Sequence, residues 1–263
     1  MHQPKKRFGQ NFIKDKNLLK KMVDSAEIKG LNVLEIGPGL GALTQFLTVD
    51  AKKYLAYEID YSLKPTLKSF ESSNASFKFM DFLEDEHLSV TLQSYFGDEE
   101  VHLVGNLPYY ITTPIIFKFL ETKKLKSATI MIQKEVGERM VSNTNTKAYN
   151  AFSAILQYYC KVVRIMNVDK KMFYPVPKVD SMIIKLTKKE LPLSEELSRR
   201  YEMIVKMAFA QKRKTLVNNI ADKTHESKEK IQAFLKELGY QEQIRAENLL
   251  VEDFIRLTTN WPF

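Results

Sequence analysis

Residues 31–41 read LNVLEIGPGLG, and this stretch decides the fold class. An apolar run of strand length ends in Gly37, Gly39 and Gly41, and a helical pattern begins directly after them. Glycine lets a backbone approach a ligand closely, because no Cβ stands in the way. The spacing is G-x-G-x-G and not the G-x-G-x-x-G of a dinucleotide fingerprint, which disfavours NAD and FAD. The stretch predicts a strand, a ligand-binding turn and a helix in an α/β sheet; a tight turn without a ligand is the alternative.

Apolar, β-branched runs alternate with helical patterns through the first half of the chain. The runs lie at 31–37, 54–59, 76–80, 101–107 and 128–132, with helical patterns at 41–50, 62–71 and 114–121. This alternation indicates βαβ units around a parallel sheet. Two more strand-like runs, 161–168 and 181–186, have only a loop between them and should add antiparallel strands at one edge. The prediction is a Rossmann-like α/β domain with a mostly parallel seven-stranded sheet.

From Ser194 to the C-terminus the sequence pattern is helical. Helices are predicted over 194–209, 213–221, 227–239 and 251–259. Ser194 and Ser227 are the expected N-caps, and Gly239 is the expected C-cap. We therefore expect a domain boundary near Lys188, with the α/β domain over 1–188 and a small all-helical domain over 189–263.

The length and composition are those of a soluble globular protein. Hydrophobic residues make up 44% of the chain and charged residues 27%, and no apolar run is long enough to span a membrane. The N-terminal MHQPKKRFGQ lacks the apolar segment of a signal peptide. Cys160 is the single cysteine, so an intrachain disulfide is impossible, and the four histidines lack metal-ligand spacing. We expect a cytoplasmic protein without a membrane segment or a structural metal.

Basic residues give the chain a net charge of +8 and gather in clusters. The clusters are Lys5-Lys6-Arg7, Lys123-Lys124, Lys170-Lys171, Lys188-Lys189, Arg199-Arg200 and Lys212-Arg213-Lys214. A single cluster is usually a solvated surface, but several of them beside a ligand pocket favour a polyanionic partner, most simply nucleic acid. Lys212, Arg213 and Lys214 follow an apolar helical pattern. We expect them on a continuing helix, with two of them facing phosphates of that partner and one facing solvent or the first domain.

Acidic residues end the second and third predicted strands. Glu58, in YEID, lies where a carboxylate can accept hydrogen bonds from both hydroxyls of a ribose. Asp81 ends the third run, in position to accept from an adenine amino group. With the glycine turn for an amino-acid tail, these strand ends describe S-adenosyl-L-methionine, whose sulfonium has no pyrophosphate to be held.

The sequence NLPY ends the fourth predicted strand, beside the expected reactive methyl group. An exocyclic adenine nitrogen is a poor nucleophile, because its lone pair is delocalised into the ring. If the Asn106 side-chain oxygen and the Leu107 carbonyl accept the amino hydrogens, the nitrogen can pyramidalise toward the methyl carbon without a strong base. Pro108 would rigidify the turn, and Tyr109 would stack on a base that has left its RNA helix. The alternative is that Tyr109 and Tyr110 are core residues.

Six motifs along the chain are shared with a known family. They are RFGQNF (7–12), EIGPGLGALT (35–44), GNLPYYITTP (105–114), QKEVGERM (133–140), FYPVPKVDS (173–181) and AFAQKRKTL (208–216). On these motifs the chain resembles the KsgA/RsmA family of small-subunit ribosomal RNA adenine N6-dimethyltransferases. The residues after about 220 match only in being helical.

The resemblance implies a function for each half of the chain. Enzymes of the family use S-adenosyl-L-methionine to dimethylate two adjacent adenosines at N6 in the loop of the 3′-terminal hairpin of 16S rRNA, and they are thought to act in late small-subunit assembly. Residues 1–188 should therefore form a class I methyltransferase domain, and residues 189–263 a helical RNA-positioning domain. The expected partner is the small ribosomal subunit or its late precursor, bound by a monomeric protein.

The resemblance also assigns site residues. Its cofactor contacts fall on Asn11, Ile13, Gly37, Glu58, Asp81 and Asn106. Asn11 and Ile13 give no chemical signal of their own. Phe173 matches an aromatic that packs on the target base opposite the motif tyrosine; a loop aromatic tucked under Pro175 and Pro177 is the alternative. Tyr110 stands where the family often has Asn, and we expect the pocket to tolerate this change.

Three other functions stay open. A related group methylates an adenosine of large-subunit (23S) rRNA and confers macrolide resistance with the same Asn-x-Pro-Tyr chemistry, but TTP after that motif, Asp180 in PKVDS and QKRKTL favour the small-subunit enzymes. A second alternative is an assembly factor whose methylation is secondary, although the intact NLPY argues for activity. A dehydrogenase is disfavoured by the glycine spacing and by the lack of an obvious hydride-transfer acid or base.

Overall fold

The computed structural model describes residue 5, residues 9–13 and residues 15–263. Lys6 and Arg7 of the first basic cluster, and the Arg7 and Phe8 that begin RFGQNF, lie outside this range. The described residues form two compact units. The first comprises those up to Gly137 together with Val162–Lys188, and the second comprises Glu138–Lys161 together with Lys189–Phe263.

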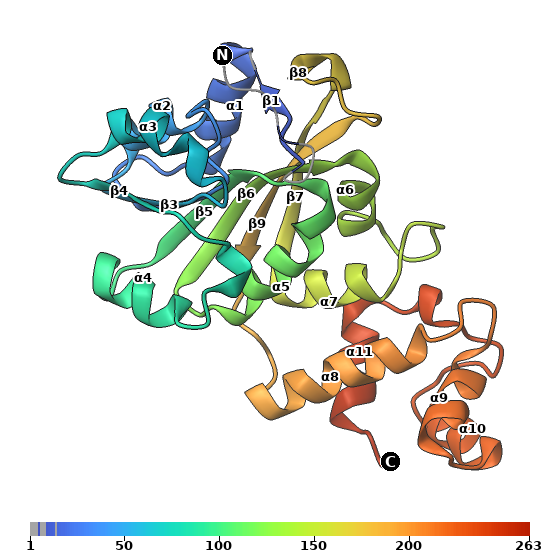
Figure 1. The fold of residues 1–263 in the computed structure, drawn as a ribbon. Coiled ribbons are helices and arrows are strands. Elements are labelled where there is room, and N and C mark those ends of the chain that lie inside the picture. Colours follow the sequence, from blue (N-terminus) through green and yellow to red (C-terminus); the bar gives the residue numbers. More distant parts are fainter. Residues whose placement is uncertain (1–4, 6–8, 14) are drawn as a thin grey trace. The chain divides into compact units, whose positions relative to one another are not determined.

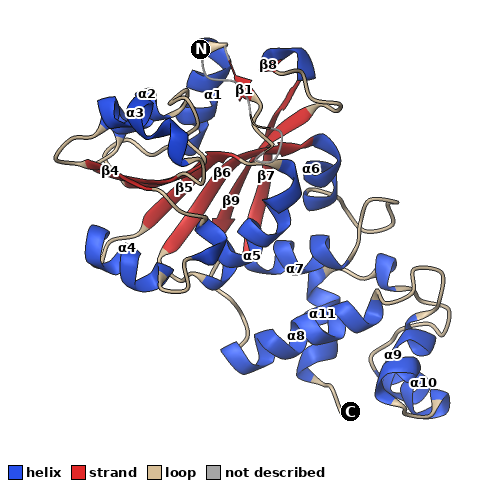
Figure 2. Ribbon diagram, viewed as in Figure 1, coloured by secondary structure: helices blue, strands red, loops and turns tan. Residues whose placement is uncertain are grey.

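The first unit is built on a seven-stranded sheet with the strand order β4-β3-β2-β5-β6-β9-β7 (Figure 2). Its strands are β2 (Asn32–Ile36), β3 (Lys53–Tyr57), β4 (Ala75–Lys78), β5 (Val101–Asn106), β6 (Leu125–Gln133), β7 (Cys160–Val168) and β9 (Ser181–Lys188). The neighbours from β4 to β6 pair in parallel, and β9 pairs antiparallel with β6. The predicted mostly parallel seven-stranded sheet, with an antiparallel strand toward one edge, is confirmed.

Helices cover both faces of this sheet (Figure 1). They are α1 (Lys16–Ala26), α2 (Thr44–Asp50), α3 (Lys64–Leu67), α4 (Leu88–Phe96) and α5 (Thr112–Glu121), and α6 (Lys134–Met140) follows β6. Helices α1, α2 and α3 lie on one side, and α4 and α5 lie on the other. Strand β2 is buried along its whole length, as expected for a strand covered on both faces. The predicted helix over 62–71 is instead α3 between the 3₁₀ turns Tyr61–Leu63 and Lys68–Phe70.

The central strands β2 and β5 approach each other closely at Gly105. A Cβ at this position would lie 2.8 Å from the Ile36 carbonyl oxygen and 3.1 Å from the Leu107 side chain. Any other residue would therefore push the two strands apart. Glycine at 105 lets the carboxyl ends of β2 and β5 lie side by side. Strand β2 ends directly before Gly37, and β5 ends at Asn106.

A second, two-stranded sheet joins segments that are far apart in the sequence. Strand β1 (Phe12–Ile13) pairs antiparallel with β8 (Phe173–Tyr174), and Ile13 lies opposite Phe173. Both of these side chains are buried in the hydrophobic core that also contains residues of α1. The QNF and FYPVPK motifs are thus held against each other, which the sequence does not predict because neither strand is longer than two residues.

The second unit is helical. Its helices are α7 (Ala151–Tyr159), α8 (Glu195–Ala208), α9 (Leu216–Thr224), α10 (Lys228–Glu237) and α11 (Val251–Thr259), with a 3₁₀ turn at Ala246–Asn248. Segment 138–161, which the sequence places in the α/β domain, belongs to this unit, and its Tyr149 and Tyr158 are buried against the C-terminal helices. The Tyr158 and Tyr201 rings stack with centroids 4.1 Å apart, and the Tyr149 hydroxyl donates to the Leu249 carbonyl at 3.0 Å.

Two of the three expected caps of the C-terminal helices are observed. Ser194 and Ser227 are N-caps whose side chains accept from the backbone N–H groups of Leu197 and Lys230. Leu238 is the C-cap of α10, and Gly239 follows it with φ +81°. Among the described helices, none is both long enough and apolar enough to cross a membrane.

Lys212, Arg213 and Lys214 do not lie on a helix. They occupy the turn between α8 and α9, and α9 begins at Leu216 rather than at 213. Thr215 is the N-cap of α9, and its hydroxyl accepts from the Asn218 N–H at 3.4 Å. The expectation of a continuing helix was therefore wrong, because an N-capping threonine starts a new helix directly after the basic residues.

Candidate active site

Four of the predicted site residues lie in one row at the carboxyl edge of the sheet. Strands β4, β3, β2 and β5 are adjacent and parallel, so all four end at the same edge. Asp81, Glu58 and Gly37 follow the first three of these strands, and Asn106 is the last residue of β5. Open α/β sheets bind their ligands outside this edge.

A cavity opens at this edge, and four short segments contribute to its wall. They are residues 9–13, 37–39, 58–59 and 106–109. Of the residues predicted from the sequence, the wall contains Asn11, Ile13, Gly37, Gly39, Glu58, Asn106, Leu107, Pro108 and Tyr109. Asp81 and Phe173 are not among the described residues that line it. The structure thus brings the N-terminal segment together with three of the strand ends.

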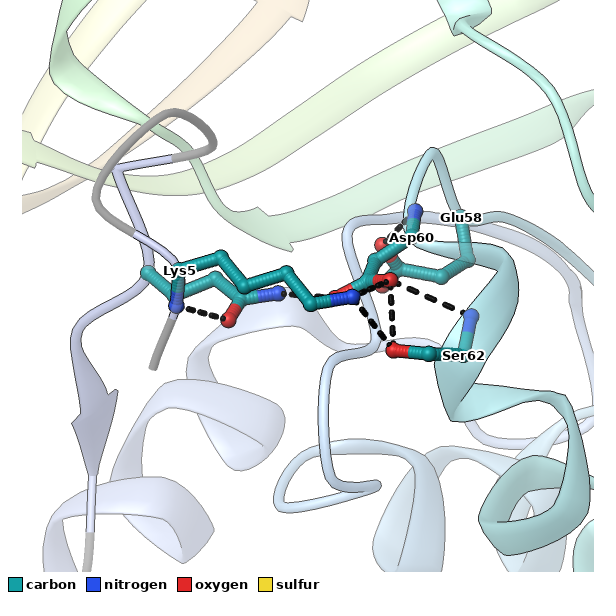
Figure 3. Close-up of polar contacts among 5 residues, drawn as sticks. Lys5, Glu58, Asp60 and Ser62 are labelled. Carbon is teal, nitrogen blue, oxygen red and sulfur yellow. Dashed lines mark hydrogen bonds and ion pairs between the residues drawn. The ribbon is translucent and has the colours of Figure 1, made fainter. Parts of the chain in front are cut away.

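Backbone N–H groups hold the Glu58 carboxylate in the cavity wall. One oxygen accepts from the Gly39 N–H at 3.0 Å. The other accepts from the Asp60 N–H at 2.8 Å (Figure 3). Burial raises the pKa of the Glu58 carboxyl, and the bonds from Asp60 and Gly39 oppose that rise. Each carboxylate oxygen keeps a second lone pair, so the oriented carboxylate can accept from a pair of ribose hydroxyls.

Gly37 leaves open space in front of this carboxylate. Its φ of +69° is in the left-handed region that favours glycine, and a Cβ there would meet no described atom within 4 Å. A side chain at this position would point into the space that a ligand would use. The open glycine, the oriented Glu58 and the neighbouring Ile59 together fit an adenosyl group with an amino-acid tail.

A second carboxyl group, that of Glu35, lies beneath the glycine turn. It is fully buried, and it accepts hydrogen bonds from the Tyr54 hydroxyl and, at 2.8 Å, from the Thr44 hydroxyl. Burial raises the pKa of Glu35 to about 7, although both hydroxyls lower it. The cluster joins β2, β3 and α2, so it fixes the glycine turn to the elements on both sides of it.

Asp81 has a local structural role. Its side chain accepts from the Leu83 N–H at 2.8 Å and caps the 3₁₀ turn Phe82–Glu84. Its negative charge also contributes, after burial, to a raised pKa of the Tyr110 phenol. Asp81 therefore lies near the NLPY turn, and one of its oxygens is already used as a cap. Its contact with an adenine amino group stays a proposal.

The side-chain amide of Asn106 is oriented by the N-terminal segment. Its Nδ2 donates to the Asn11 backbone carbonyl at 3.0 Å. This bond assigns the amide nitrogen to Asn11 and leaves Oδ1 as the group that can accept. Asn11 thus acts through its carbonyl on the predicted catalytic residue, which the sequence alone does not reveal.

Two hydrogen-bond acceptors at the NLPY turn have no partner among the described residues. Within the part of the chain that the structure describes, neither Asn106 Oδ1 nor the Leu107 carbonyl accepts a hydrogen bond. The next carbonyl, that of Pro108, is by contrast occupied by the Ile111 N–H and the Thr112 hydroxyl. The free pair matches an amino group, which has two hydrogens to donate.

The two proposed stacking aromatics differ in their surroundings. Tyr109 lines the cavity, and its hydroxyl lies 2.8 Å from the Ser181 hydroxyl, which orients the ring. Phe173 is 3% exposed and packs in the core with Ile13. Tyr109 is placed to meet a ligand, whereas Phe173 would have to turn out of this cluster to contact a base.

Comparison with known proteins agrees with this geometry. Residues 1–261 match the family described as "Ribosomal RNA adenine dimethylase". The chain belongs to this family. It is therefore an S-adenosyl-L-methionine-dependent methyltransferase, as the glycine turn, Glu58 and NLPY predict.

Named relatives and solved structures cover nearly the whole chain. The chain is 46% identical over 260 residues to "Ribosomal RNA small subunit methyltransferase A" of Aster yellows witches'-broom phytoplasma (strain AYWB), which covers 99% of this chain and 97% of that protein. A dimethyladenosine transferase from Plasmodium falciparum has a TM-score of 0.77 at 26% identity, covering 95% of this chain and 98% of that one. The 23S rRNA methyltransferase ErmE has a TM-score of 0.73 at 27% identity, covering 95% and 99%.

Some residues that line the cavity were not predicted from the sequence. Ile59 directly follows Glu58, lines the cavity and is 43% exposed, so it offers the cavity an apolar surface next to the strand-end acid. Gln10 and Phe12 are placed only by the long-range contacts of the N-terminal segment. No group of three or more His, Cys, Asp or Glu residues within 5, 9–13 and 15–263 could hold a metal ion.

The basic turn of the second unit contains an exposed cation, Arg213, whose guanidinium has no partner among the described residues. Lys214 forms an ion pair with Asp222 at 2.6 Å, and the Lys212 ammonium donates to the Lys147 carbonyl at 2.9 Å. Arg213 is exposed, and the described residues offer its guanidinium no ion-pair or hydrogen-bond partner. Of the three predicted RNA contacts, Arg213 has its charge most available.

Replacing Glu58 tests the cofactor half of the site. Glu58→Ala should weaken binding of both S-adenosyl-L-methionine and its demethylated product by about ten- to a hundredfold, because hydrogen bonds to a charged group contribute about 1.5–3 kcal/mol. In the wild type, affinity should fall as the pH drops through the raised pKa of Glu58, since protonation removes the charged acceptor. Calorimetry measures both effects. Glu99→Ala, which removes an exposed carboxylate paired with Lys52, is the control; equal affinities in the two variants would refute the ribose assignment.

Proposed function

We propose that the enzyme dimethylates the N6 amino groups of two adjacent adenosines in the 3′-terminal hairpin loop of small-subunit (16S) rRNA. Its partner would be the small ribosomal subunit or a late precursor of it, met in the cytoplasm by a monomeric enzyme. The observation that carries the proposal is the pair of free acceptors, Asn106 Oδ1 and the Leu107 carbonyl, beside the Gly37 and Glu58 end of one cavity.

These two acceptors solve the chemical problem of an adenine amino group. Its nitrogen lone pair is conjugated with the ring, so the nitrogen attacks only after it becomes pyramidal. Acceptors at Asn106 and Leu107 draw the two hydrogens out of the ring plane and favour that geometry. No described carboxylate or histidine is needed as a strong base at this point, because the proton becomes acidic once the nitrogen has been alkylated.

Residues of the cavity wall would hold the cofactor. Glu58 would take the ribose hydroxyls, the open face of Gly37 would admit the amino-acid tail, and Ile59 would pack on the adenine. Asp81 and Ile13 are proposed as further contacts. When bound, S-adenosyl-L-methionine supplies an electrophilic methyl group. Because Asn106 ends the strand next to the one that leads into Gly37, the acceptors lie next to the cofactor end of the cavity.

The small-subunit substrate is supported by the relatives rather than by the cavity. The 23S rRNA methyltransferase ErmE shares the fold, so the fold does not discriminate between the two substrates. The much higher identity to proteins called ribosomal RNA small subunit methyltransferase A favours small-subunit RNA. Residues 112–114, Asp180 and the QKRKTL segment point the same way. A role in late assembly is compatible with catalysis, because the same contacts would hold the particle.

The direct test supplies labelled S-adenosyl-L-methionine with unmethylated small or large ribosomal particles. Small particles should acquire label as N6,N6-dimethyladenosine in the 3′-terminal hairpin, and large particles should not. Asn106→Ala should reduce turnover about a hundredfold or more while cofactor affinity changes little, because the lost bond acts in the transition state. Label in large-subunit RNA would favour the macrolide-resistance activity, and unchanged turnover of Asn106→Ala would refute the mechanism.

Tyr109 and Phe173 are proposed to stack on the target adenine, but they should respond differently to truncation. Tyr109→Ala should lower RNA turnover, since stacking contributes about 1–3 kcal/mol per base, and should leave cofactor binding intact. Phe173→Ala should also destabilise the fold by about 3–5 kcal/mol, because its side chain is buried. Denaturant unfolding and turnover measure the two effects. If Phe173→Leu, which fills most of the space, restores both stability and turnover, Phe173 is a core residue only.

We propose further that residues 189–263 position the RNA through the turn at Lys212, Arg213 and Lys214. Phosphate contacts of this kind fix register without reading bases, so base recognition stays with the Asn106 cavity. The support is the exposed guanidinium of Arg213 on a turn that also carries two lysines.

Charge reversal tests this turn. The double variant Lys212→Glu and Arg213→Glu should bind the ribosomal particle more weakly and should lower the salt-dependence slope of the affinity by about 0.7 for each lost contact. The affinity for S-adenosyl-L-methionine should not change, because its site lies in the first unit. Arg199→Glu with Arg200→Glu is the matched control, since these exposed arginines on α8 pair with Glu195 and Glu196. Equal slopes in both double variants would mean that the turn is only a solvated surface.

A further inference from the structure

The carboxylate of Asp60 gathers four hydrogen bonds next to the cavity (Figure 3). Its Oδ1 accepts from the Lys5 ammonium at 2.6 Å and from the Ser62 N–H and hydroxyl at 3.1 and 2.7 Å. Its Oδ2 accepts from the Gln10 side-chain amide at 3.0 Å. The backbone N–H of the same residue donates to Glu58. Asp60 therefore connects the N-terminal segment to the residue that is proposed to hold the ribose.

The network around Asp60 is buried and charge-assisted. Asp60 is 2% exposed, and its partner Lys5 is 32% exposed. Burial alone would raise the pKa of Asp60, but the bonds from Lys5, Ser62 and Gln10 outweigh it and lower the pKa to about 2. The carboxylate is therefore charged near neutral pH. Gln10 is further fixed because its side-chain oxygen accepts from the Lys5 N–H at 2.9 Å.

The segment that Asp60 holds is the one that orients Asn106. Gln10 precedes Asn11, whose carbonyl accepts from the Asn106 amide. On the other side of Asn11, Phe12 and Ile13 pair with β8. The Asn11 carbonyl is therefore fixed between two anchors, namely the Gln10 bond to Asp60 and the pairing of β1 with β8. The pairing of β1 with β8 is backed by buried side chains of the hydrophobic core, whereas the Gln10 contact with Asp60 is a polar bond.

We infer that Asp60 and Gln10 are positioning residues that set the orientation of the Asn106 amide through the Asn11 carbonyl. The inference rests on the proposed function of Asn106. An amide that turns over presents Nδ2 in place of Oδ1, and a donor facing an amino group repels it. When the Gln10 bond to Asp60 is lost, the Asn11 carbonyl moves and both amide orientations become populated. The Glu58 turn is joined to Asp60 through the Asp60 backbone N–H, whereas the Gln10 bond is made to the Asp60 carboxylate.

A purely structural role predicts something different. If the network only fastened the N-terminus, its loss would lower stability or cofactor affinity and would leave the rate of the bound complex unchanged. A positioning role lowers kcat on the ribosomal particle and leaves the particle KM and the cofactor affinity almost unchanged. The split between kcat and KM therefore separates the two roles.

The experiment uses Gln10→Leu, which removes the amide and keeps the side-chain volume. With unmethylated small particles, kcat should fall about tenfold or more, because a displaced catalytic group of this kind costs about one to two orders of magnitude in rate. Lys5→Met should show a smaller loss in the same direction, and Lys5→Arg should retain activity. Lys52→Met is the matched control, since it breaks a 2.6 Å ion pair with Glu99 elsewhere in the same unit, and it should have wild-type kcat.

Each outcome decides between the two roles. An unchanged kcat for Gln10→Leu, or a loss that also appears in Lys52→Met, overturns the inference. The inference is also overturned if Gln10→Leu loses thermal stability, Lys5→Met does not, and both Lys5→Met and Lys5→Arg have wild-type kcat. In that case the loss in Gln10→Leu reflects destabilisation and not positioning. If the wild type methylates neither small nor large particles, the proposed function fails instead, and the wild-type reaction run in parallel makes that visible.

Discussion

Parallel pairing of β4, β3, β2 and β5 is the constraint on which the site depends. Because parallel strands end at the same edge, residues separated by many positions in the sequence come into one row there. Gly105 keeps the last two of these strands close, since a larger residue would meet the Ile36 carbonyl. The Gly37 turn and the NLPY turn are adjacent for that reason. The chemistry needs this proximity, because methyl transfer depends on placing a weak nucleophile accurately.

The sheet alone does not complete the site. Asn106 can present either an oxygen or a nitrogen, and the strand that carries it does not choose between them. The choice comes from the Asn11 carbonyl, on a segment held by β8 and by Asp60. A segment near the N-terminus thus sets which side-chain atom of Asn106, the oxygen or the nitrogen, faces the cavity. The buried Glu35 cluster plays a comparable part on the cofactor side, where it fixes the glycine turn.

Much of the fold and of the proposed site could be predicted from the sequence, and the features that could not be predicted share a physical cause. The strands, the glycine turn, Glu58 and NLPY carry local patterns, so the sheet and most of its functional edge follow from them. The β1–β8 pairing and the Asp60 network consist of long-range contacts between very short segments, which leave no periodicity. The helix predicted through Lys212 to Lys214 failed because Thr215, an ordinary polar residue in the pattern, caps a new helix. The burial of Phe173 follows from the same β1–β8 pairing.

The most direct test of this account is a crystal structure of the enzyme with S-adenosylhomocysteine and an RNA hairpin that contains the target adenosines. The flipped adenine N6 should lie within hydrogen-bond distance of both Asn106 Oδ1 and the Leu107 carbonyl, with Asn106 Nδ2 still bonded to the Asn11 carbonyl. A structure in which N6 contacts neither acceptor, or in which Asn106 presents Nδ2 to the base, would contradict it.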